Sequence, residues 1–297
     1  MRRIPLHEVR RRTCKPLDSW WTVLLVDPYA TRLVRLVSPW RRVTPDRLTA
    51  LAAVFGLGAA ACFAGPGRWW PVLGALLFHC GFVADCMDGK IARLRDEGSL
   101  FGGWCDFMLD RLRAIVCAAA LMGGQYLHTG QVRYLWLIAL VIGCDLLRYL
   151  NAGQVALLRE AVEARSETLG NAPAAPSADG DRAPSSGGGR APSSGGGRLK
   201  AALAGRRIRT HLFSGIEFEM AVFVIGPLIG FVGTTAIVAA VLLAVFELRI
   251  VRYAWRVTRP AAIHSLATAS GPAPHSLRTD ASVVRQASGI SDMSGIA

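Results

Sequence analysis

Hydrophobic residues gather in long stretches along this chain, separated by polar segments. Six stretches can be read, at residues 48–64, 69–83, 115–127, 134–147, 218–232 and 235–248. A helix that crosses a bilayer needs about 20 apolar residues, and several stretches are shorter than that. The second and third reach this length only if the polar segments 84–94 and 102–114 continue their helices. The pattern predicts an all-α integral membrane protein with six transmembrane helices, two of which carry charged residues at one end.

A weaker pattern precedes the first stretch. Over residues 20–37 apolar and charged positions alternate, and Leu33, Leu36 and Val37 have helical spacing. This spacing predicts an N-terminal amphipathic helix that lies beside the membrane. The alternative is a short helix packed against the rest of the domain. Thr44 and Pro45 follow, and they predict the start of the first spanning helix, with Thr44 as its N-cap.

Composition excludes two broad classes of protein. The residues AVILMFWYC make up 52% of the chain and charged residues only 19%, which excludes an ordinary soluble domain and an intrinsically disordered chain. The net charge of +13 suggests either a nucleic-acid binder or a membrane protein with basic loops. Long apolar stretches separate the basic residues, so we expect a lipid bilayer and no nucleic acid as partner.

The charges are distributed unevenly between the loops. Basic residues crowd the N-terminus and residues 90–95, 198–209 and 249–259, whereas segments 65–68, 128–133 and 233–234 are almost uncharged. By the positive-inside rule, both termini are cytoplasmic in a multi-pass protein of the cell membrane. An even number of spans agrees with this orientation, which also places segments 84–94 and 102–114 on the cytoplasmic side.

The same features divide the chain into regions. Residues 1–43 form a basic N-terminus with the juxtamembrane helix, and residues 44–256 form the six-helix domain. A low-complexity insert at about 171–198 interrupts this domain and repeats RAPSSGGG in tandem. Such a segment cannot bury a core, and we expect a flexible cytoplasmic linker. Residues 257–297 are rich in Ser, Ala, Gly and Pro and predict a disordered tail.

Two polar segments carry the candidate chemistry. Asp85 and Asp88 share a helical face at the end of the second span, and Asp106 and Asp110 share one at the start of the third. A connection of about eight residues makes these helices antiparallel neighbours. We therefore expect four carboxylates to converge at the cytoplasmic edge of the membrane.

Clustered carboxylates repel one another unless a cation lies among them. Their oxygens suit hard divalent ions such as Mg²⁺ or Mn²⁺, and four carboxylates on two helices can hold two metals about 3.5–4 Å apart. Two such ions would bind a diphosphate and stabilise phosphoryl transfer. Gly89 and Ala92 leave room for a flat base, and Arg93 offers a positive fork for a phosphate.

Two other interpretations of the carboxylates exist. Asp85 and Asp88 could form interhelical salt bridges with Arg111 and Arg113, which would make the cluster structural. A simple cation-binding or transport site would explain the four carboxylates. It would not explain the small residues and the arginine beside them.

The spacing of these residues is that of a known family. Asp85-x2-Asp88-Gly89-x2-Ala92-Arg93-x8-Gly102-x3-Asp106-x3-Asp110 resembles the complete signature of the CDP-alcohol phosphatidyltransferases. The six spans and the preceding helix extend the similarity to about residues 15–256, without the insert. The resemblance implies a transferase of phospholipid biosynthesis that moves a substituted phosphate from a CDP-alcohol to an acceptor hydroxyl and releases CMP.

The resemblance also implies roles for individual residues. Asp85, Asp88 and Asp106 match metal ligands, and Asp110 matches the last ligand and the general base. Residues that match the signature or the family's donor-binding positions are Thr44, Pro45, Asp46, Arg47, Gly89, Ala92, Arg93, Ser99 and Gly102. The donor is then a CDP-alcohol, most simply CDP-diacylglycerol. Homodimers are common in the family.

The acceptor is harder to assign. Asp110-Arg111 and Thr44-Pro45-Asp46 resemble the branch that uses inositol phosphate, although Ala114 stands where that branch often has Asp. A phosphorylated acceptor needs further cations, and the candidates are Arg113, Arg148, Arg206, Arg207 and Arg209. In the alternative reading Arg148 pairs locally with Asp145, and the last three arginines only set topology. A non-catalytic membrane module that binds cations or a partner is the alternative function.

Overall fold

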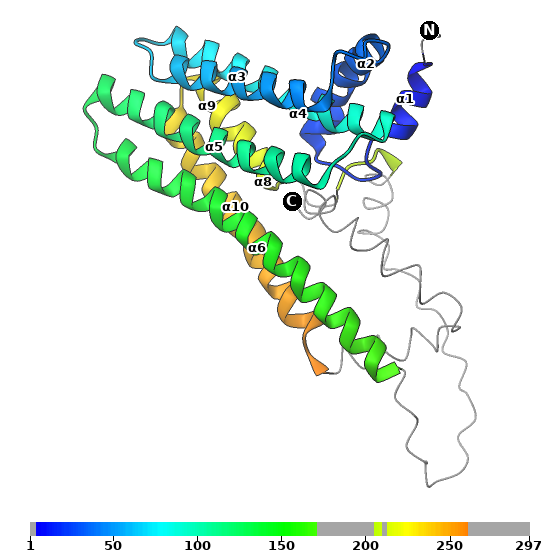
Figure 1. Cartoon of the computed structure of the whole chain (residues 1–297). Coiled ribbons are helices and arrows are strands. Elements are labelled where there is room, and N and C mark those ends of the chain that lie inside the picture. The colour runs from blue at the N-terminus through cyan, green and yellow to red at the C-terminus, as the bar shows by residue number, and fades with distance from the viewer. Residues whose placement is uncertain (1–3, 171–204, 210–212, 261–297) are drawn as a thin grey trace, which may run out of the picture.

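The chain is helical throughout most of its described length (Figure 1). The computed structural model describes residues 4–170, 205–209 and 213–260. Its helical elements are α1 (Leu6–Thr13), the π-helix η1 (Thr22–Val26), α2 (Asp27–Val37), α3 (Pro45–Phe63), α4 (Trp69–Arg95), α5 (Leu100–Thr129), α6 (Arg133–Gly170), α8 (Gly215–Met220), the π-helix η2 (Ala221–Ile225), α9 (Gly226–Ile229) and α10 (Val232–Val257). This confirms the predicted all-α class. The predicted insert and nearly all of the predicted tail lie outside the described residues.

Four of these helices are long and apolar enough to cross a membrane: α3, α4, α6 and α10. The chain is therefore a multi-pass membrane protein. α5 is also long, at 30 residues, but its first half is rich in charged side chains. The fifth predicted span is divided into α8, η2 and α9, each too short to cross alone. The six-span arrangement stays a prediction.

The two polar segments continue their helices, as predicted. α4 runs through segment 84–94 and ends before Asp96, which takes a left-handed conformation with φ 54°. α5 begins after a short connection, where the Ser99 hydroxyl accepts a hydrogen bond from the Gly102 N–H at 2.9 Å. This tight connection brings the polar ends of α4 and α5 together.

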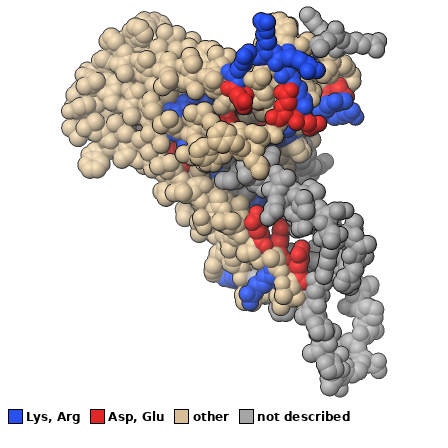
Figure 2. Space-filling model, in the orientation of Figure 1, with Lys and Arg blue, Asp and Glu red and all other residues tan. Residues whose placement is uncertain are grey.

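α3 packs against both α4 and α5, and α5 packs in turn against α6 (Figure 1). α6 runs beside α10, and the two extend away from the other helices. The rings of Phe78 on α4 and Phe223 on η2 lie 4.7 Å apart in the buried core. On the face in Figure 2, charged side chains gather near the N-terminal helices and towards the end of α6, and the surface elsewhere is almost free of them.

The predicted N-terminal amphipathic segment is helical and consists of η1 and α2. α2 packs against α4, and a buried ion pair between Asp27 and Lys90, at 2.9 Å, fixes this contact. Leu33 and Leu36 are exposed on its other side. The alternative prediction, a short helix packed against the rest of the domain, therefore holds for one face of this segment. Its position beside a membrane stays a prediction.

Candidate metal centre and active site

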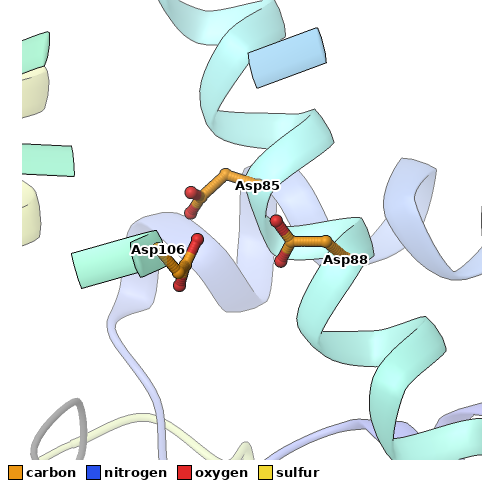
Figure 3. Close-up of side chains that lie close together, drawn as sticks. All are labelled: Asp85, Asp88 and Asp106. Carbon is orange, nitrogen blue, oxygen red and sulfur yellow. The ribbon is translucent and has the colours of Figure 1, made fainter. Parts of the chain in front are cut away.

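Three aspartates from two helices converge at the polar ends of α4 and α5. Asp85 and Asp88 lie one turn apart on α4, Asp106 lies on α5, and the three carboxylates point towards one another (Figure 3). One oxygen from each lies within 4.8 Å of the other two. We call these residues the three-aspartate cluster.

The cluster fits a divalent cation. Two ionised carboxylates at this separation repel by about 3–4 kcal/mol at an effective dielectric constant of about 20, so all three need a counter-charge. One Asp106 oxygen, Oδ1, is buried and has no hydrogen-bond partner among the described residues. Carboxylate oxygens are the ligands that hard divalent ions prefer. These observations fit metal ligation better than a set of interhelical salt bridges.

Asp110 lines a pocket beside the cluster. The pocket lies between α3, α4 and α5 and is lined by Thr49, Ala52, Ala53, Asp85, Asp106, Leu109, Asp110 and Arg113. Asp110 is half-buried, and its Oδ1 lies 2.8 Å from the Arg113 guanidinium. Arg113 also lies 3.9 Å from Asp85, so one of the interhelical salt bridges proposed in the alternative interpretation is present. Arg111, the other arginine of that interpretation, pairs elsewhere.

Thr49 is a site residue that the sequence analysis missed. Its hydroxyl donates a hydrogen bond to Asp88 Oδ2 at 2.6 Å and orients that carboxylate. Thr49 lies one turn beyond Pro45 on α3. The available signal was a hydroxyl near the predicted donor-binding stretch, but the sequence does not reveal which face of α3 meets α4.

The first predicted donor-binding stretch begins α3. Thr44 is the N-cap, where its hydroxyl accepts from the Arg47 N–H at 3.4 Å, and Pro45 is the first helical residue. The predicted helix start is thus confirmed. Arg95, at the end of α4, donates to the Val43 carbonyl at 2.7 Å. This bond ties the start of α3 to the end of α4.

The other donor candidates lie on α4 and at the start of α5. A Cβ added at Gly89 would lie 3.5 Å from the Arg93 guanidinium, so the Arg93 side chain lies beside Gly89 on this face of α4. Arg93 Nε donates to the Thr13 carbonyl at 2.9 Å and so links α4 to the N-terminal segment. Ser99 and Gly102 form the N-terminal cap of α5. Ala92, which precedes Arg93 on α4, is half-buried. Asp46, near the start of α3, is exposed.

Two of the candidate acceptor arginines lie beside acidic residues. Arg113 faces Asp110, as described above. Arg148 is fully buried, and its Nε lies 3.3 Å from Glu247 of α10. Asp145 is bound by Arg111, at 2.6 Å.

The remaining candidates lie on segment 205–209, which contacts the N-terminal segment. Arg207 forms an ion pair with Asp27 at 3.1 Å, and Arg206 is exposed. The backbone N–H of Arg209, a buried residue, donates to the Asp18 carbonyl at 3.0 Å. Burial lowers the pKa of both Lys15 and Arg209, since it disfavours the charged form. The segment forms a basic region separate from the pocket lining.

Comparison with known proteins relates the part of the chain that contains this site to one family. Residues 42–176 match the model of the CDP-alcohol phosphatidyltransferase family. This part of the chain is therefore similar to CDP-alcohol phosphatidyltransferase domains. The match contains α3, α4 and α5, and so contains the three-aspartate cluster and Asp110. Members of the CDP-alcohol phosphatidyltransferase family are transferases that use divalent metals.

The chain is also similar to a curated relative. This is the bifunctional IPC transferase and DIPP synthase of Aquifex aeolicus (strain VF5), which is 29% identical over 115 residues. The match covers 38% of this chain and 26% of the relative. The chain thus spans about a quarter of the length of the relative that it matches.

Proposed function

We propose that this protein transfers a substituted phosphate from a CDP-alcohol to the hydroxyl of a small polyol or polyol phosphate, and releases CMP. One observation carries this proposal: the three-aspartate cluster adjoins a pocket that Asp110 also lines, within a domain of a family of transferases. The donor that we expect is CDP-diacylglycerol. Because the relative is named as a transferase and synthase, and Asp110-Arg111 resembles the inositol-phosphate branch, inositol 1-phosphate is the first acceptor to test.

The carboxylates of the cluster would hold Mg²⁺ or Mn²⁺. A bound divalent ion neutralises the donor's diphosphate and stabilises the charge that develops on the transferred phosphoryl group. Thr49 supports this role because its hydroxyl fixes the orientation of Asp88. Gly89 and Arg93 lie together on one face of α4, where we place the cytidine and diphosphate of the donor.

Asp110 is the base that we assign. As the acceptor oxygen bonds to phosphorus, its proton passes to the Asp110 carboxylate. The bond from phosphorus to the CMP oxygen breaks, and CMP leaves with that electron pair. Arg113, whose Nη2 lies 2.8 Å from Asp110 Oδ1, holds this carboxylate in position beside the cluster.

We further propose that residues 44–256 form one membrane domain with both termini and the site on the cytoplasmic side. The basic loops support this orientation. Arg113, which lines the pocket, remains a candidate for binding the phosphate of the acceptor, together with Arg148 and the arginines of segment 205–209. A homodimer remains a prediction from the family.

The test is CMP release by the purified full chain in detergent, with CDP-diacylglycerol and Mg²⁺ or Mn²⁺. The acceptors are inositol 1-phosphate, inositol, glycerol 3-phosphate, serine and phosphatidylglycerol. We expect metal-dependent release with one of them and none after chelation with EDTA. If no acceptor supports release, and CDP-inositol also fails as donor, the proposal is wrong and the non-catalytic module is favoured.

The assignment of Asp110 has its own test. Asp110→Asn keeps the size of the side chain but cannot take up the proton, so we expect loss of turnover with binding of the metal retained. Glu160→Gln removes one exposed carboxylate from the far part of α6 and is the matched control, with normal turnover. If Asp110→Asn releases CMP as fast as the control, another group is the base.

A further inference from the structure

Arg113 provides a fixed positive charge inside the carboxylate site. It lies one turn beyond Asp110 on α5 and is 8% exposed. Its Nη2 is 2.8 Å from Asp110, and its Nη1 is 3.9 Å from Asp85. The guanidinium therefore lies close to Asp85, which belongs to the three-aspartate cluster, and to Asp110, which does not.

Residues of two neighbouring helices pack around the Arg113 side chain. A Cβ added at Gly56 of α3 would lie 2.8 Å from both Cγ and Cδ of Arg113, so a glycine is needed where the side chain passes. At the other end, the guanidinium lies 5.4 Å from the centre of the Phe78 ring. Two helices besides α5 thus hold Arg113 in place.

The carboxylates divide into two groups around this arginine. The three-aspartate cluster has ligand oxygens within 4.8 Å of one another, and Asp110 is not part of that group. A second divalent ion bound between Asp85 and Asp110 would have to approach the cation that already contacts both. Like charges repel strongly at such distances inside a protein.

The geometry points to Arg113 as a built-in substitute for a second divalent ion in the free protein. One ion binds at the three-aspartate cluster, and the guanidinium neutralises Asp110. This differs from the sequence-based prediction of two ions per site. The inference rests on the proposed metal-dependent function, but it concerns ion binding alone and can be tested without turnover.

The experiment counts Mn²⁺ ions bound to the purified full chain without donor, by electron paramagnetic resonance of the free ion. We expect one ion per wild-type chain. Arg113→Gln, which removes the charge at similar size, binds a second ion at least tenfold more tightly than the wild type does. Arg113→Lys keeps the charge and binds one. Arg165→Gln, an exposed arginine far along α6, is the matched control and binds one.

Asp88→Asn identifies the counted ion, because it removes a ligand of the cluster and weakens the first site. A wild-type count of zero or two ions overturns the inference. The inference is also overturned if Arg113→Gln elutes as folded protein and binds only one ion. If that variant aggregates, the wild-type and Arg113→Lys counts decide. Absence of CMP release from a protein that binds one ion rejects the proposed function and leaves this inference standing.

Discussion

A close approach between α3 and α5 predicts that replacing one glycine of α5 lowers the free energy of unfolding. Gly124 of α5 lies against the end of α3, where an added Cβ would overlap the Phe63 carbonyl oxygen and lie 3.2 Å from Ala64 Cα. Both atoms belong to the backbone, so no side-chain rotation can relieve the overlap. Gly124→Ala therefore forces the two helices apart. Gly123 is the control, because a Cβ there meets no atom of the described chain within 4 Å.

The comparison isolates the packing cost. Replacing glycine by alanine inside a helix stabilises it by about 0.5–1 kcal/mol, and this gain is common to both variants. Overpacking a close contact typically costs about 1–3 kcal/mol. The free energy of unfolding of Gly124→Ala should therefore fall below that of Gly123→Ala by about 1–3 kcal/mol, with Gly123→Ala at or above the wild type.

The assay is thermal unfolding in detergent, followed by the folded fraction recovered on size-exclusion chromatography. For a domain of this size, 1 kcal/mol corresponds to a shift of about 2–4 °C in Tm. Equal Tm values for the two variants, or a higher value for Gly124→Ala, would show that α3 and α5 are not in contact at this point. Neither position lies in the metal site, so the result does not depend on the proposed function.

Two further predictions concern polar contacts. Arg111→Met leaves Asp145 and Glu219 buried without their cation, and we expect a loss of about 3–5 kcal/mol in detergent unfolding. An unfolding curve like that of the wild type would contradict these ion pairs. Thr49→Val removes the hydroxyl that orients Asp88, and we expect about a tenfold loss of Mn²⁺ affinity, which Thr49→Ser restores. Wild-type affinity in Thr49→Val would mean that the hydroxyl has no part in the site.

Local features of the sequence predicted the parts of the structure that depend on neighbouring residues. Thr44 and Pro45 marked the start of α3, because a cap needs only the next three residues. The continuation of α4 and α5 through polar segments followed from aspartates that recur at helical spacing on one face. A short connection joins the two helices, so residue spacing was enough to predict that Asp85, Asp88 and Asp106 lie close together, whereas the fourth predicted member, Asp110, lines the adjoining pocket.

The features that escaped prediction depend on contacts between distant parts of the chain. α6 was expected over residues 134–147 but runs to Gly170. Hydrophobicity detects only the apolar part of a helix that continues beyond it with polar residues. Arg111 binds Glu219, 108 positions away, and no local pattern indicates that pairing.

The directions of Arg111 and Arg113 explain how one helix serves two polar networks. Residues two positions apart on an α-helix point about 200° apart around its axis, so these arginines face opposite ways. Arg113 turns towards the pocket and meets Asp110, whereas Arg111 turns towards α6 and α8 and binds Asp145 and Glu219. A change at Arg111 should therefore lower stability, and a change at Arg113 should alter metal binding. If both variants changed both properties equally, the two networks would be one, and the separation of structural from functional charge along α5 would fail.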